Sequence, residues 1–156
     1  KALLKMQKPF HEGTYAERFA SMGDEAESQF EAHNTQWARF GFNRPEGMTK
    51  FHYLPHVIRY TPDYVQADPT RLVEVMGMGR TPLKIKMEKI AAMQWWDGLE
   101  APLYLWVWSS TRQNYAEVTF RQLMNIINKN DVPLGNFSEG KKYFSISSKL
   151  LPWNGD

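Results

Sequence analysis

The segment Leu103–Ser109 (LYLWVWS) constrains the fold of this chain most, because it is apolar at both its odd and its even positions. A strand with one face in water alternates apolar and polar residues, whereas a strand covered on both faces is apolar almost throughout. We therefore expect residues 103–109 to form a central strand with other elements packed against both sides. Such layering is typical of mixed α/β domains.

Other segments carry weaker strand patterns. Residues 71–76 (RLVEVM) are rich in β-branched side chains, and residues 143–147 form a further candidate strand. Residues 50–65 also resemble a strand, but Pro55 and Pro62 interrupt them. Proline removes a ladder hydrogen bond, so this region predicts two short strands or one bent strand near a sheet edge.

Three segments have the spacing of amphipathic helices. Apolar side chains recur every three or four positions over residues 23–40, and Gly41 is placed to end that helix. A second helix is predicted over residues 82–96, where Pro82 suits a first helical position, and a third over residues 117–130. The predicted fold class is therefore α/β, with a mixed sheet in the order α-β-β-β-α-β followed by a C-terminal helix.

The bulk composition indicates one domain. A chain of 156 residues without repeats or Gly/Ser-rich linkers predicts a single domain over 1–156, with an N-terminal arm at 1–20 and a C-terminal extension at 131–156. The formal net charge of +2 tolerates an anionic partner without requiring one. The absence of cysteine excludes disulfides and thiolate zinc sites, and no run approaches 18 apolar residues, so we expect a soluble protein with no membrane partner.

Two acidic residues, Asp63 and Glu74, lie within the segments that predict strands. Glu74 lies within the apolar run 71–76, where a buried charge needs a partner, a metal ion or solvent. A hairpin turning at residues 68–71 makes Asp63 a diagonal neighbour of Glu74, and a turn at residues 67–70 places the two directly opposite. Either register puts both carboxylates on one face, as an Mg²⁺ site requires. The competing interpretation is that Asp63 caps a turn while Glu74 pairs with a nearby cation such as Arg71.

The segments Tyr60-Thr61-Pro62-Asp63-Tyr64 and Val73-Glu74-Val75 resemble the PD-(D/E)xK nuclease superfamily. The similarity extends from the Gly-Asp-Glu-Ala-Glu run at 23–27 to the Ser-Ser-Thr-Arg run at 109–112, and it is greatest to phage endonuclease I-type Holliday-junction resolvases and very-short-patch-repair-like nucleases. The resemblance implies a restriction-endonuclease-like core. It also implies a DNA endonuclease that uses Mg²⁺ or Mn²⁺, with Asp63 and Glu74 as metal ligands.

Carried over by position, the resemblance makes Glu27 the acid of the first helix, with Glu25 as the rival assignment. The family has a lysine two residues after the strand acid, but here that position is Met76. Either a lysine from the next helix (Lys84, Lys86 or Lys89) replaces it, or the chain has kept the fold without the activity. We take Lys86 as the catalytic candidate, so the predicted catalytic set is Glu27, Asp63, Glu74 and Lys86.

Further polar residues are candidates for DNA contacts, because cations near the two acids and a Ser/Arg loop after a strand suit phosphate. They are Arg80, Lys84, Lys89, Ser110 and Arg112. The function expected is a phage-encoded DNA endonuclease, acting as a homodimer on branched DNA in the cytoplasm of an infected host cell. The alternative is a catalytically silent DNA-binding relative, or a structural or assembly protein that meets other proteins in a phage virion.

Overall fold

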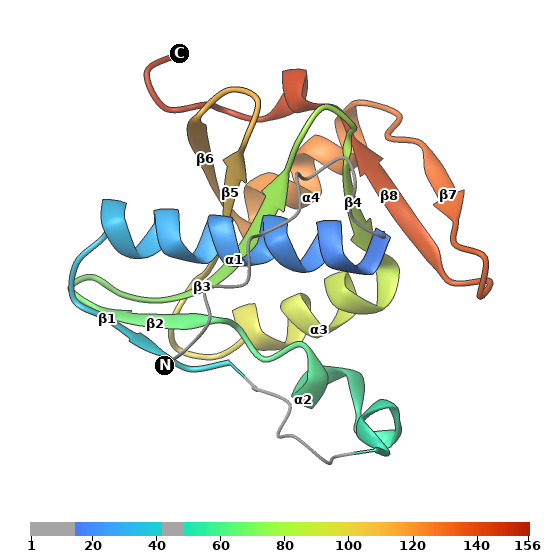
Figure 1. Cartoon of the computed structure of the whole chain (residues 1–156). Helices are drawn as coiled ribbons and strands as arrows, with labels where there is room; N and C mark the ends of the chain where they lie inside the picture. The colour runs from blue at the N-terminus through green and yellow to red at the C-terminus, as the bar shows by residue number, and fades with distance from the viewer. Residues whose placement is uncertain (1–14, 42–48) are drawn as a thin grey trace, which may run out of the picture.

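The computed structural model describes residues 15–41 and 49–156, and within them the chain folds as a mixed α/β structure with two sheets (Figure 1). The larger sheet has the order β1-β2-β3-β5-β6, and the smaller has the order β4-β8-β7. The strands of the two sheets are β1 Trp37–Arg39, β2 Tyr64–Ala67, β3 Thr70–Met78, β4 Leu83–Lys86, β5 Leu103–Ser109, β6 Asn114–Thr119, β7 Leu134–Asn136 and β8 Lys142–Ile146. The α-helices are α1 Tyr15–His33, α2 His56–Arg59, α3 Met87–Asp97 and α4 Phe120–Lys129.

The predicted central strand is confirmed with its bounds. β5 pairs in parallel with β3 on one side and antiparallel with β6 on the other. All its residues except Tyr104 are buried. The mixed α/β class is also confirmed, because β3 and β5 form the parallel pair of an otherwise antiparallel sheet.

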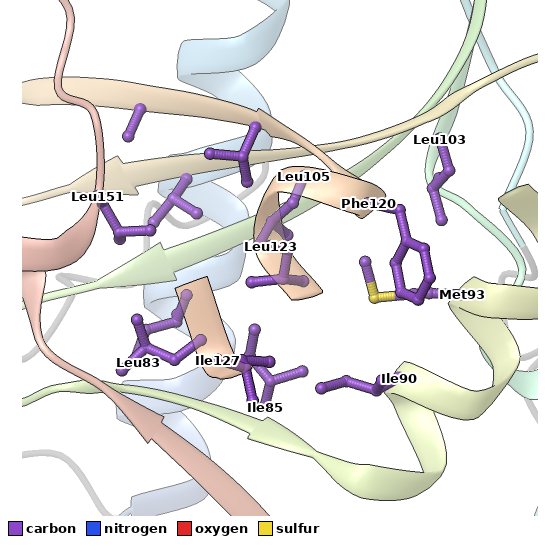
Figure 2. Packing of buried hydrophobic residues seen from close by; sticks show 14 of the residues in the cluster. Leu83, Ile85, Ile90, Met93, Leu103, Leu105, Phe120, Leu123, Ile127 and Leu151 are labelled. Carbon is purple, nitrogen blue, oxygen red and sulfur yellow. The ribbon is translucent and has the colours of Figure 1, made fainter. Parts of the chain in front are cut away.

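Helices cover both faces of the larger sheet. On β3, Val73 and Val75 point to the side that carries Phe30 of α1, while Leu72 and Met78 point to the opposite side. That opposite side holds the larger core, where α3 and α4 pack between the two sheets, as Figure 2 shows. The side chains labelled in Figure 2 are Leu83, Ile85, Ile90, Met93, Leu103, Leu105, Phe120, Leu123, Ile127 and Leu151.

The first helix and its neighbour differ from the sequence prediction. α1 begins by Tyr15 and ends at His33, so residues 15–20 of the predicted arm are helical, and residues 1–14 lie outside the described residues. The prediction of helix up to residue 40 was wrong, because residues 37–39 pair with β2 as an edge strand. Tertiary packing explains this, since the ring of Trp37 packs edge-on against Tyr64 at 5.5 Å.

The region before β2 is helical where strands were predicted. Phe51–Tyr53 form a single 3₁₀ turn, and α2 follows with Pro55 at its N-cap. Proline lacks only a donor that a helix start leaves unused, so Pro55 begins a short helix here instead of interrupting a strand. Of the predicted stretch, only residues 64 and 65 are β-strand, as the start of β2.

Two other predicted helices begin later in the structure than the sequence indicates. The predicted helix over 82–96 begins only at Met87, because residues 83–86 (LKIK) alternate between buried and more exposed side chains and pair with β8. The predicted helix over 117–130 begins at Phe120, where Thr119 and Gln122 form a capping box, and the residues before it form β6.

Residues 131–156 supply β7, β8 and three buried core residues, Ile146, Leu151 and Trp153. In the parts of the chain that the structure describes, no helix is long and apolar enough to cross a membrane.

Candidate active site

The hairpin of β2 and β3 brings Asp63 and Glu74 together. Its register pairs Tyr64 with Val73 and Ala67 with Thr70, so the turn is the one at residues 67–70. One step beyond the Tyr64–Val73 pair, Asp63 lies opposite Glu74. The backbone confirms this proximity, because the Val75 N–H donates to Asp63 Oδ2 at 2.8 Å.

Lys89 is the partner of Glu74. Its Nζ lies 2.8 Å from Glu74 Oε1, and only 17% of the Lys89 side chain and 8% of the Glu74 side chain are exposed. Arg71, the alternative partner considered for Glu74, instead donates to Gln66 and Glu117. Lys89 is the third residue of α3, so the helix after β4 delivers a cation to the strand acid.

Burial and neighbouring charges shift the pKa values of Asp63 and Lys89, the two groups that flank Glu74. The pKa of Asp63 is raised well above its ordinary value, first by desolvation and next by the charge of Glu74. A side-chain hydrogen bond with Glu74 adds to this rise. Burial alone would lower the pKa of Lys89, but the charges of Glu74 and Asp63 outweigh burial and raise it.

A pocket of about 140 Å³ opens over these groups. It is lined by Glu27, Arg39, Gly41, Arg59, Tyr60, Thr61, Asp63, Glu74 and Lys89. The structure separates the two rival acids of the first helix, because Glu27 faces this pocket while Glu25 accepts a hydrogen bond from Trp108 Nε1 at 2.9 Å. Desolvation and then the charge of Asp63 raise the pKa of Glu27.

The donor set fits a hard divalent cation that keeps part of its water shell. Over residues 15–41 and 49–156, no three His, Asp or Glu side chains form a ready metal cluster. Glu27 is instead held by Arg39, whose Nη1 lies 3.3 Å from its Oε2. Asp63 and Glu74 remain as two neighbouring carboxylates, and Mg²⁺ characteristically binds through one or two carboxylates and completes its shell with water and phosphate oxygens.

Lys86 does not lie in this pocket, so the structure contradicts its placement beside the two carboxylates. It ends β4, where its Nζ lies 3.7 Å from Glu139 and 5.3 Å from the ring centre of Phe137. The reason is the later start of α3, which leaves residue 86 in a strand and puts Lys89 in the first turn of the helix.

The remaining predicted DNA-binding residues lie away from the pocket, except for Lys89. Lys84 is exposed on β4 and stacks on Tyr143, while Arg80 is exposed in the loop before that strand. Ser110 bonds to the Met78 carbonyl and Arg112 stacks on Trp153. These two follow Ser109, which is four residues along β5 from the partner of Glu74, or roughly 13 Å.

Five pocket residues were not predicted as site residues from the sequence: Arg39, Gly41, Arg59, Tyr60 and Thr61. Arg39 was read as part of a helix, and Arg59 and Tyr60 as part of a strand, so their convergence could not be seen. The only sequence signal was that Arg59 and Tyr60 immediately precede the Thr-Pro-Asp segment.

Comparisons with known proteins found similar solved structures. No protein-family model matches the sequence, and no curated protein matches it either. The Holliday junction resolvase Hjc of Archaeoglobus fulgidus is similar at a TM-score of 0.43 and 16% identity, over 83% of this chain and 89% of that one. D212, a nuclease from a fusselovirus, is similar at a TM-score of 0.49 and 11% identity, over 90% of this chain and 88% of that one. The chemistry of the site is therefore argued from its own residues.

Proposed function

We propose that this chain is a divalent-metal-dependent DNA endonuclease of the PD-(D/E)xK type. The observation that carries the proposal is the part-buried pair of Asp63 and Glu74, with Lys89 bonded to Glu74 inside a pocket. Two acids and a lysine on adjoining elements are the groups that the family motif combines. Here the lysine comes from α3 instead of from residue 76.

Each side chain has a role in this proposal. Asp63 and Glu74 would hold Mg²⁺ or Mn²⁺, and the bound metal would lower the pKa of a water molecule and stabilise charge on the scissile phosphate. Lys89 fixes one oxygen of Glu74 through the 2.8 Å ion pair between them. Glu27 supplies a further acid at the pocket wall, and Arg39 sets its orientation.

The finer parts of the proposal are the substrate, the assembly and the origin. We place branched DNA such as a Holliday junction first among substrates, cut by a homodimer because such a junction needs two cuts. A phage origin and action in the host cytoplasm belong to the same proposal. Outlying cations, Arg80, Lys84 and Arg112, contribute contacts to the DNA backbone.

Met76 favours one alternative function. An apolar residue at the motif position of the lysine suits a relative that binds DNA, or that serves in a phage virion, without cutting. The alternative predicts DNA binding or particle association with no cleavage under any metal.

Cleavage assays on four-way junctions, duplexes and single strands test the proposal. We expect nicking in Mg²⁺ or Mn²⁺ and none in EDTA. Asp63→Ala lowers the rate by about 10³-fold, since several kcal/mol of transition-state stabilisation disappear with the metal. Glu100→Ala, which removes an exposed carboxylate after α3, is the matched control and keeps the wild-type rate. Metal-independent nicking, or equal rates for both variants, contradicts the proposal.

A further inference from the structure

Arg59 differs from the other cations of the pocket. Arg39 lies 3.3 Å from Glu27 and 3.2 Å from Glu31, and Lys89 lies 2.8 Å from Glu74. Arg59 lines the same pocket, yet it makes no ion pair with any residue that the structure describes. Its positive charge is therefore the one that the pocket leaves available.

The guanidinium group of Arg59 also has a donor without an acceptor. Its Nε is buried and has no hydrogen-bond partner within the described ranges. Native proteins rarely leave such a donor unpaired, because a buried donor without an acceptor costs free energy.

The side chain is held in place by its neighbours. The Arg59 guanidinium lies 5.7 Å from the ring centre of Tyr60, and the Tyr60 hydroxyl donates to Glu88 Oε1 at 2.6 Å. His56 and Lys141 also reach Glu88, at 3.2 and 3.0 Å, so the ring beneath the guanidinium is anchored to α3. A fixed guanidinium loses less conformational entropy when it binds an anion.

The geometry points to Arg59 as the phosphate-binding residue of the site, an inference that rests on the proposed function. Its planar fork of N–H donors matches the oxygens of a phosphodiester, which a lysine ammonium cannot match in the same way. Lys89 is already bonded to Glu74, so Arg59 is the pocket cation that binds a non-bridging oxygen of the DNA backbone.

DNA binding in Ca²⁺ tests this inference without relying on cleavage, because Ca²⁺ takes the same class of oxygen ligands as Mg²⁺. The dissociation constant of a labelled four-way junction is measured over a salt series for the wild type, Arg59→Met, Arg59→Lys and Arg121→Met. Arg59→Met keeps an apolar stem of similar length. Arg121→Met is the matched control, since Arg121 is exposed on α4 and does not line the pocket.

We expect Arg59→Met to weaken binding by about tenfold or more, as loss of a charge-assisted hydrogen bond does. The slope of log K against log salt becomes shallower by about 0.9, because one phosphate contact is lost. Arg59→Lys keeps the slope but recovers only part of the affinity, and Arg121→Met matches the wild type. Wild-type affinity and slope in Arg59→Met overturn the inference, and so does weaker binding at an unchanged slope, which is the result of a merely structural role.

Two further controls separate the possible failures. Thermal unfolding checks each variant. If Arg59→Met does not fold, Arg59→Gln, which also removes the charge, replaces it. Reduced affinity with a shallower slope then supports the inference, and wild-type affinity or an unchanged slope overturns it. Cleavage in Mg²⁺ is scored separately. If the wild type cuts no DNA while Arg59→Met lowers affinity and slope, the phosphate site stands and the nuclease proposal fails. If the wild type cuts DNA while Arg59→Met binds normally, the nuclease proposal stands and the phosphate site fails.

Discussion

Replacing Lys89 by methionine is expected to lower the cleavage rate by about 10²- to 10³-fold, the range over which a positioned proton-transfer or charge-stabilising group acts. The change leaves Glu74 and Asp63 without their cation. Breaking a buried ion pair by removing one partner costs about 3 kcal/mol, so the free energy of unfolding measured in urea falls as well. Lys86→Met is the matched control, because Lys86 pairs with Glu139 and lies outside the pocket.

Adding Met76→Lys to the Lys89→Met chain is expected to restore part of the activity. Residues 74 and 76 are two apart on β3, so their side chains point to the same face of the sheet. A lysine at 76 therefore reaches the site from the strand, as the family motif has it, and replaces the one removed from α3. A recovery of about tenfold over Lys89→Met checks this exchange in the junction-cleavage assay.

Two outcomes contradict the role of Lys89. One is a wild-type rate in Lys89→Met, which makes the ion pair purely structural. The other is a loss of rate in Lys86→Met equal to that in Lys89→Met, which returns the catalytic role to the residue that the sequence alone favoured.

Replacing Asp63 by asparagine is expected to remove cleavage and yet stabilise the metal-free protein. The folded-state pKa of Asp63 is raised, first by desolvation and then by Glu74, so the folded chain holds that proton more tightly than the unfolded chain does. The stability that this proton contributes is full below the ordinary pKa of an aspartate and is lost as the pH rises through the raised folded-state pKa. Asparagine cannot ionise, so the variant avoids this loss.

The measurement is the free energy of unfolding in urea at pH 3 and pH 8, with and without Mg²⁺. In EDTA the variant and the wild type are alike at pH 3, and the variant is more stable at pH 8 by about 1 kcal/mol for each unit of pKa shift. Mg²⁺ at a hundred times its dissociation constant stabilises the wild type by about 2.7 kcal/mol and leaves the variant unchanged. Asp68→Asn, in the exposed turn of the same hairpin, is the control. A variant that is less stable than the wild type at pH 8 in EDTA contradicts this account.

The sequence predicted those features that depend on local pattern. β5 is apolar at nearly every position, and only burial on both faces explains such a run. The hairpin followed from a turn signal between two strands, although Pro69 takes the third turn position and not the second, so the direct register holds. Both registers put Asp63 and Glu74 on one face, which is why that part of the site could be predicted.

The features that could not be predicted from the sequence depend on contacts between segments that are distant along the chain. The pattern Leu-Lys-Ile-Lys at 83–86 suits a strand, but Thr81 and Pro82 also suit a helix start, and pairing with β8 decides between them. The choice moves the start of the helix to Met87, and it thereby determines that Lys89 reaches Glu74. Arg59 was misread for a related reason, because a four-residue helix is too short to show a period.

A crystal of the protein soaked in Mn²⁺, with the anomalous signal of the metal recorded, tests the central claim most directly. We predict a single strong peak bonded to carboxylate oxygens of both Asp63 and Glu74, beside the Lys89 ammonium, that disappears in Asp63→Asn crystals. Saturating Mn²⁺ with no peak between those two carboxylates, or a peak held by other residues alone, would contradict it.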